Sequence, residues 1–173
     1  EAWDIQLVKY GSEVIKYREK FIKHLGEVCQ KIHNKLTGGK EKILLEYDRD
    51  VGYDSYLTEL AKKRQKDLKY STTTVGPHRD DISFIVNGID IRKYGSQGQQ
   101  RTAALSLKLA QIQLMREVMK ESPILLLDDV LSELDSNRKT YLLESIKDTQ
   151  TIITCTGLDE FISKHLPIQR MFQ

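Results

Sequence analysis

The sequence predicts an α/β fold in which a parallel sheet is covered by helices and preceded by a helical arm. The central observation is a run of four aliphatic residues, 124–127, followed directly by Asp128 and Asp129. Such a run is typical of a strand buried on both faces of a parallel sheet. Helical and strand patterns then alternate along the C-terminal part, which is the order of elements in such a sheet.

The arm is predicted from residues 1–70. Apolar residues spaced by three and four predict one amphipathic helix from Trp3 to about Leu36, ended by two glycines. Its expected inward stripe is Leu7, Val14, Phe21, Leu25, Val28, Ile32 and Leu36. A short strand over 43–47 follows. A second helix is then expected from Asp54 or Ser55 to about Leu68, packed antiparallel to the first, with Leu57, Leu60, Ala61 and Leu68 inward.

Residues 71–173 are predicted to form the second part. Two β-branched runs flank Asn87-Gly88, which predicts a hairpin with a type I′ turn. Ser96 is a natural N-cap for a long, largely buried helix. After the aliphatic strand, we expect a helix over 136–147, a strand over 151–155 and a short helix over 158–165.

Composition excludes several classes of protein. Lys and Arg number 27 against 25 Asp and Glu, so the net charge of +2 does not by itself indicate nucleic-acid binding. No apolar stretch reaches the length of a membrane span, and no signal-peptide pattern is present. Cys29 and Cys155 lie in apolar patterns and are expected to be buried free thiols, which indicates a reducing compartment such as the cytoplasm. The four histidines show no spacing typical of a zinc site.

Two motifs carry candidate chemistry. A buried strand that ends in an acid is the Walker-B arrangement, whose aspartate holds the magnesium of a nucleoside triphosphate; the alternative is a strand that simply meets a polar loop. Upstream, Ser96 can cap a helix and Gly98 allows a ligand to approach the backbone closely. The start of that helix can bind a phosphate, although a Ser-capped helix is also a common structural feature.

The order of the motifs resembles that of the ABC-type ATPases. Ser-Gln-Gly-Gln-Gln (96–100) resembles their signature motif, 124–129 the Walker-B strand, and 132–135 the D-loop. Nearly the whole chain resembles the RecF family, SMC-like ATPases of bacterial recombinational DNA repair, through the segments 74–81, 95–106 and 124–135. The resemblance implies a helical arm over 1–70. It also implies a part of an ABC-ATPase (P-loop NTPase) head over 71–173, with signature motif, Walker B and D-loop.

The resemblance also implies roles for individual residues, with ATP and Mg²⁺ as cofactors. Asp128 corresponds to the magnesium-associated aspartate and Asp129 to the general base. Ser96 and Gly98 would meet the γ-phosphate across an ATP-dependent homodimer. Gln97, Gln99 and Gln100 would shape the helix start, or else only cap and pack it. Leu134 and Asp135 would belong to the D-loop at the dimer interface. At the position of the switch histidine of many ABC proteins stands Thr156.

The family's partners are duplex or gapped DNA, single-strand junctions, and the mediators RecR and RecO, with which it loads recombinase at gaps. Four lysines on the second helix are candidate DNA contacts, the alternative being a solvated face: Lys62, Lys63, Lys66 and Lys69. For the segment 76–81, a buried Arg–Asp network and a DNA or partner contact both remain open.

A P-loop of the form Gly-x-x-x-x-Gly-Lys-Ser/Thr does not occur in the 173 residues. The chain therefore resembles the C-terminal part of a longer ATPase. It is expected to hold half of an ATP site and to be inactive alone. Two alternatives are a non-catalytic module that binds RecR and the signature lobe of another SMC-like or ABC ATPase.

Overall fold

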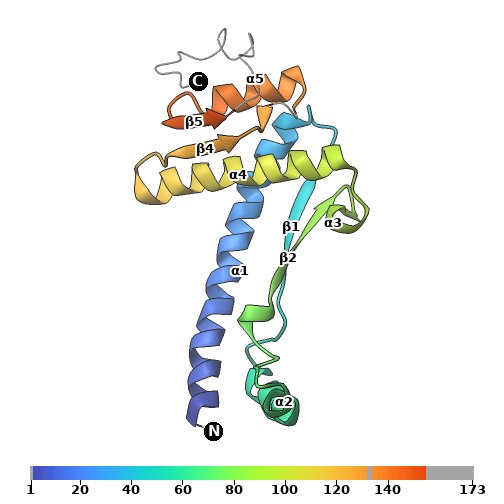
Figure 1. Ribbon diagram of the computed structural model, residues 1–173, viewed down its shortest axis with the longest axis vertical. Coiled ribbons are helices and arrows are strands. Elements are labelled where there is room, and N and C mark those ends of the chain that lie inside the picture. Colours follow the sequence, from blue (N-terminus) through green and yellow to red (C-terminus); the bar gives the residue numbers. More distant parts are fainter. Residues whose placement is uncertain (1, 132–133, 155–173) are drawn as a thin grey trace.

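The computed structural model describes residues 2–131 and 134–154. These residues form an elongated molecule with a head at one end and an arm at the other (Figure 1). The elements follow the chain in this order: α1 (Ala2–Leu36), β1 (Ile43–Asp48), α2 (Tyr56–Tyr70), the 3₁₀ turn η1 (Pro77–Arg79), β2 (Asp81–Val86), β3 (Ile89–Asp90), α3 (Ile91–Tyr94), α4 (Gln97–Met119), β4 (Leu125–Asp128), α5 (Ser136–Ser145) and β5 (Thr151–Thr154). The helix expected over 158–165 lies outside the described residues, as do Cys155 and Thr156.

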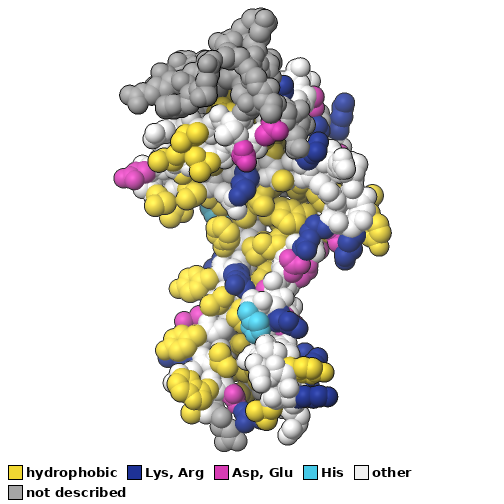
Figure 2. Space-filling model, in the orientation of Figure 1, with side chains coloured by type: hydrophobic (Ala, Val, Ile, Leu, Met, Phe, Trp, Pro, Cys, Tyr) yellow, Lys and Arg dark blue, Asp and Glu magenta, His cyan; other side chains and the backbone are white. Residues whose placement is uncertain are grey.

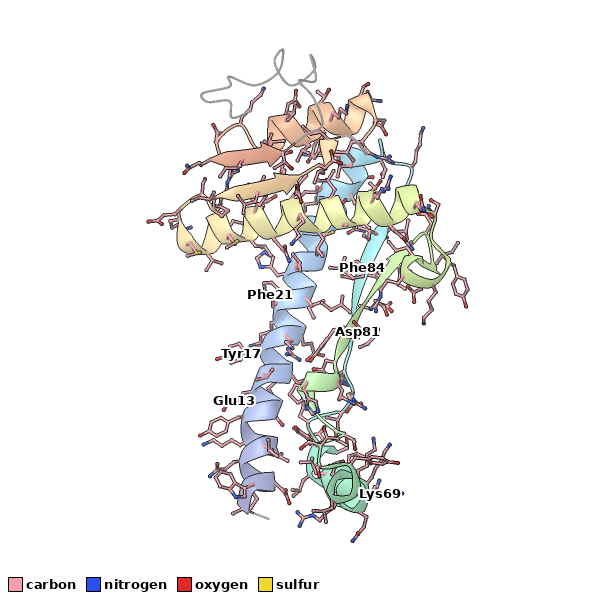
Figure 3. All side chains as sticks on the ribbon, in the orientation of Figure 1. Glu13, Tyr17, Phe21, Lys69, Asp81 and Phe84 are labelled. Atoms are coloured by element: carbon pink, nitrogen blue, oxygen red, sulfur yellow. The ribbon has the colours of Figure 1, made fainter. Side chains whose placement is uncertain are left out.

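The long helix α1 has the predicted length, but its two halves bury different faces. Its C-terminal half buries Leu25, Val28, Ile32 and Leu36 as expected. In the N-terminal half, Ile15 and Ile22 are buried instead, and the expected inward residues Leu7, Val14 and Phe21 are exposed. Tyr17 and Phe21 project from the side of α1 that faces away from β2 (Figure 3). The prediction failed because adjacent apolar pairs such as Val14-Ile15 create two stripes, and tertiary contacts decide which one is buried.

The second helix crosses the first. Figure 1 views α2 almost end-on beside the upright α1, so the expected antiparallel packing is wrong. Only Tyr56 and Leu60 of α2 are buried, whereas Leu57, Ala61 and Leu68 are exposed. A crossing helix touches its neighbour over a short length, which leaves room for few inward residues. Tyr56 packs against Gly11 of α1, where an added Cβ would lie 2.6 Å from the tyrosine ring.

Between arm and head runs a three-stranded antiparallel sheet with the order β1-β2-β3. Ile43 pairs with Val86 at the end nearest the hairpin. The turn between β2 and β3 has Asn87 and Gly88 at φ values of 49° and 83°. Both residues are therefore left-handed, as a type I′ turn requires, and the predicted hairpin is confirmed.

The head consists of α4, α5 and the parallel pair β4–β5. Its core also contains α1 and β1, because Leu25 and Ile32 belong to the same buried cluster as Leu109 of α4 and Leu142 of α5. The packing therefore does not divide at residue 70. Cys29 lies in this core as a free thiol, as predicted, and burial raises its pKa to about 12.

The strand β4 is not buried on both faces, contrary to the prediction. Leu127 is 7% exposed, whereas Leu126 is 69% exposed and pairs with Ile152 of β5, which is 57% exposed. In the described part of the chain the parallel sheet has two strands, and the helices cover one of its faces. The other face presents aliphatic side chains to solvent.

The segment 76–81 connects α1, β1 and the loop after β1 through the buried carboxylate of Asp80. The Asp80 side chain is 2% exposed and accepts hydrogen bonds from the Arg18 guanidinium at 3.1 Å, the Tyr47 hydroxyl and the Asp50 amide at 2.9 Å. Gly76 has a φ of 131° and would, with a Cβ, collide with the Tyr56 hydroxyl. Asp80 of this segment thus forms an Arg–Asp pair with Arg18 of α1, whereas His78 and Arg79 of the same segment are exposed.

Candidate functional site

The start of α4 is held by a reciprocal capping box. The Ser96 hydroxyl accepts from the Gln99 amide at 3.2 Å, and the Gln99 side-chain oxygen accepts from the Ser96 amide at 3.1 Å. The Gln100 amide makes the first intrahelical bond, to the Ser96 carbonyl at 3.0 Å. Helix geometry provides no intrahelical carbonyl for the amides of Gln97 and Gly98. These two amides and the hydrogen of the Ser96 hydroxyl are the donors that this helix end can offer to an anion.

The signature glutamines have different roles. Gln97 is exposed at the first helical position. The Gln99 side chain belongs to the capping box and also donates to Glu41 at 3.2 Å. The Gln100 side chain donates to the Ile91 carbonyl at 2.8 Å and so ties α4 to α3. The side chains of Gln99 and Gln100 thus have the capping and packing roles that were left open above, and they shape the helix start.

The two aspartates at the end of β4 differ in backbone conformation. Asp128 ends the strand, and its carboxylate accepts a hydrogen bond from the Thr154 hydroxyl of β5. Asp129 has a φ of 49°, and its amide donates to the Thr154 carbonyl at 3.2 Å. This left-handed residue takes the chain out of the strand. Both side chains are exposed.

Asp128 fits a magnesium ion as one carboxylate ligand. Mg²⁺ is usually held by one or two carboxylates together with phosphate oxygens and water. Over residues 2–131 and 134–154, no group of three or more His, Cys, Asp or Glu side chains is placed to hold a metal ion. Among the described residues, Asp128 could therefore supply only part of the coordination that Mg²⁺ takes.

The segment that resembles a D-loop leads into α5. Leu134 is buried in the core. Asp135 is the N-cap of α5, where its carboxylate accepts from the Arg138 amide at 3.0 Å and pairs with the Arg138 guanidinium at 3.0 Å. Leu134 therefore anchors the loop and Asp135 orients the helix that follows it.

The two parts of the candidate site lie on the helix and the strand that run in opposite directions across the head. Figure 1 shows that α4 begins on the side of α3 and that β4 points toward that side. The donors at Ser96–Gly98 lie at the start of α4, whereas the carboxyl end of the shorter β4 lies beside the middle of α4 in this view.

The candidate DNA-binding lysines lie far from this site, on α2 in the arm (Figure 1). Lys62, Lys66 and Lys69 are exposed, and Lys63 is partly buried. Lys69 projects on the side of α2 away from α1 (Figure 3), and Figure 2 shows Lys and Arg side chains over this end of the molecule. Lys62 forms an ion pair with Glu59 at 2.7 Å.

No helix in the described part of the chain is long and apolar enough to cross a membrane.

Two residues that sequence reasoning missed reach the signature helix. His33 of α1 is fully buried, with its Nδ1 atom 2.9 Å from the Ser106 hydroxyl of α4. Its Nε2 atom lies 3.2 Å from a Glu41 carboxylate oxygen. A histidine inside an otherwise apolar stripe was the signal available in the sequence, but its partner, 73 residues away, was not.

Comparisons with known proteins agree with these features. The chain is 55% identical over 172 residues to the DNA replication and repair protein RecF of Agathobacter rectalis, and 55% identical over 173 residues to that of Lachnospira eligens. These matches cover 99% and 100% of this chain and 48% of each relative, so the chain spans about half the length of its curated relatives. No family model matches.

Solved structures agree as well. A structure described as the recombination mediator protein RecF-ATP in the RecFOR pathway superposes with a TM-score of 0.81 at 38% identity. The RecF-ATPrS structure of that pathway superposes with a TM-score of 0.78, also at 38% identity. Both cover 92% of this chain and 45% of the other. Over the half of their length that it spans, the chain is therefore homologous to the RecF proteins.

Proposed function

We propose that the chain is the signature-bearing part of a RecF-type ATPase that dimerises with ATP. The observation that supports this most strongly is the capped start of α4, where the amides of Gln97 and Gly98 and the Ser96 hydroxyl are the donors available to a phosphate. In this proposal Ser96, Gln97 and Gly98 receive the γ-phosphate of a nucleotide held mainly by the other subunit. Asp135, which is exposed, lies along the subunit interface, whereas Leu134, which was expected there too, is buried in the core and anchors the loop.

The chemistry is transfer of a phosphoryl group to water, which depends on positioning and on neutralising charge. When bound, ATP and Mg²⁺ supply the reacting phosphate and its counter-charge. Asp128 acts as a carboxylate ligand of the metal, oriented by Thr154. Asp129 accepts a proton from the attacking water, directly or through a second water.

Two features support the proposal that this lobe hydrolyses ATP only together with the further residues of a RecF-length protein. The 173 residues contain no P-loop. The bare face of the β4–β5 sheet carries Leu126 and Ile152, and stable parallel sheets have both faces covered. We infer that additional strands and helices of a RecF-length protein cover that face.

The separate roles of the two aspartates can be tested in a RecF-length protein that carries this sequence. Asp128→Asn is expected to weaken magnesium-dependent nucleotide binding by at least about tenfold, because the metal loses a charged ligand. Asp129→Asn is expected to preserve binding and to slow hydrolysis by about a hundredfold or more, which traps a long-lived dimer. Nucleotide titration and single-turnover kinetics measure the two steps. Failure of both variants at the same step would rule out separate roles.

We further propose that the arm contributes to DNA binding, in a cytoplasmic protein that acts with RecR and RecO at duplex or gapped DNA and single-strand junctions. Lys62, Lys66 and Lys69 are separated by four and three residues and share one face of α2, where they can neutralise a few phosphates. Lys63 lies beside them. The RecF-ATP structure is that of a recombination mediator of the RecFOR pathway, which supports other mediators as partners of that protein.

Reversing Lys62, Lys66 and Lys69 to Glu is expected to lower DNA affinity roughly tenfold at moderate salt and to flatten its salt dependence. Because the three side chains are exposed, the fold should be unchanged. Fluorescence anisotropy with gapped duplex DNA across a salt titration measures both effects. A matched control reverses Lys20, Lys23 and Lys31, which are exposed on α1 and change the net charge equally. Equal losses in both variants would indicate a general charge effect and place the DNA surface elsewhere.

A further inference from the structure

His33 lies at a junction between α1, α4 and the loop before β1. Its ring is fully buried, and both ring nitrogens have a partner. Nδ1 lies 2.9 Å from the Ser106 hydroxyl, and Nε2 lies 3.2 Å from Oε2 of Glu41. Burial lowers the pKa of His33 below its ordinary value; Glu41 opposes this shift, and Arg138 of α5 adds to it. The lowered pKa favours the neutral ring, which carries one hydrogen.

The position of that hydrogen follows from the partners. A Glu41 carboxylate only accepts hydrogen bonds, so the neutral ring donates from Nε2 to Glu41. Nδ1 must then accept from the Ser106 hydroxyl. The Ser106 oxygen also lies 2.7 Å from the Thr102 carbonyl, one turn earlier in α4. The single hydrogen of the Ser106 hydroxyl can be donated to Nδ1 or to the Thr102 carbonyl. Because the Glu41 carboxylate holds the ring hydrogen on Nε2, Nδ1 is an acceptor and receives the hydrogen of Ser106.

The network continues from Glu41 to the signature motif. Oε1 of Glu41 accepts from the Gln99 side-chain nitrogen at 3.2 Å. The oxygen of the same Gln99 amide accepts from the Ser96 backbone amide. Gln99 is therefore held at both ends, by Glu41 and by the N-cap. Each Glu41 oxygen has one partner in this chain of contacts, and its side chain is 20% exposed.

We propose that His33 and Glu41 are positioning residues of the signature motif, which hold Gln99 and, through it, the Ser96 cap in the conformation that receives phosphate. The proposal rests on the proposed function of Ser96–Gly98. Neither residue touches the nucleotide. His33 fixes the direction of the Glu41 carboxylate from the buried side, and Glu41 selects one orientation of the Gln99 amide. The first turn of α4 is then pre-formed and does not have to be ordered when the subunits meet.

A pair of substitutions at Glu41 separates this role from simple packing. In Glu41→Ala, Gln99 loses one of its two anchors. In Glu41→Gln, the new amide oxygen can still accept from Gln99, which obliges its NH₂ group to donate to His33 Nε2. The ring hydrogen must then move to Nδ1 and be donated to Ser106, whose own hydrogen turns to Thr102. Every group keeps a partner, so Glu41→Gln should preserve the motif with His33 in the other tautomer.

The experiment uses a RecF-length protein carrying this sequence, with ATPγS as the probe. Glu41→Ala is expected to weaken nucleotide-dependent dimerisation about tenfold, a loss typical of a hydrogen bond, without changing the nucleotide affinity of the monomer. Glu41→Gln should dimerise as the unchanged protein does. Nitrogen NMR of the His33 ring should show hydrogen on Nε2 in the unchanged protein and on Nδ1 in Glu41→Gln. Glu27→Ala, on an exposed position of α1, is the control.

Dimerisation of Glu41→Ala equal to that of Glu27→Ala would overturn the positioning role, as would an unchanged His33 tautomer in Glu41→Gln. If circular dichroism shows that Glu41→Ala does not fold, the tautomer and the dimerisation of Glu41→Gln decide the question. Failure of the unchanged protein to dimerise with ATPγS would instead contradict the proposed function, and the tautomer shift would still test the network.

Discussion

Replacing Ser96 with arginine in a RecF-length protein that carries this sequence is expected to abolish ATP-dependent dimerisation. The hydroxyl sits at the very start of α4, is exposed, and lies beside the two amides that face away from the helix. Arginine removes the cap acceptor, which typically costs about 1 kcal/mol, and places a long side chain where the second subunit's phosphate should enter. Sedimentation velocity with and without ATPγS measures the loss.

Nucleotide binding by the monomer should remain nearly unchanged, because the proposed contact is made across the dimer. Ser55→Arg is the matched control: Ser55 is the N-cap of α2, at the far end of the arm, and its side chain does not bond the helix amides. An equal loss of nucleotide affinity in monomeric Ser96→Arg would show that the motif acts within one subunit. An equal loss of dimerisation in both variants would point to a general effect of the added charge.

The parts of the fold that were predicted correctly depend on local chemistry. The Asn87-Gly88 turn requires left-handed backbone at both residues, and the Ser96 cap requires only residues 96–99, so a short sequence window contains all the information. The length of α1 follows from its apolar spacing and from the glycines at 38 and 39, which both adopt positive φ.

The errors arose where distant residues decide. Whether Val14 or Ile15 is buried depends on Tyr56 and Val75, which pack against Ile15 in the arm's own core. The bare face of Leu126 could not be inferred from an aliphatic run, because the same pattern suits a strand with one or two covered faces. Likewise, the sequence identified Ser96, Asp128 and Asp129 as site residues but not His33 and Glu41, whose contacts with α4 span 73 and 58 residues.

Removing the Asp80 carboxylate is expected to have the largest effect on stability. Asp80→Ala should lower the free energy of unfolding by about 3 kcal/mol, because several donors lose a buried charged acceptor and hydrogen bonds to charged groups are worth about 1.5 to 3 kcal/mol. The Tyr47 hydroxyl and the Asp50 amide would lose their acceptor, and Arg18 its buried counter-charge. Urea unfolding followed by circular dichroism measures the change.

The neighbouring carboxylate provides the control, because Asp81 differs from Asp80 in burial more than in chemistry. Asp81 is exposed and pairs with the exposed Arg92 at 2.7 Å, so Asp81→Ala should barely change stability.

A pH titration of the stability gives a second measurement. Burial and the bond to Asp80 raise the pKa of Tyr47 from 10 to about 12. Folded Tyr47 thus keeps its proton more tightly than unfolded Tyr47, and stability should fall as pH rises between those values. Asp80→Ala should lower the pKa of Tyr47 in the folded protein and so narrow the pH range over which stability falls. Equal stability of the two alanine variants, with the Tyr47 titration unchanged, would mean that Asp80 does not hold the arm together.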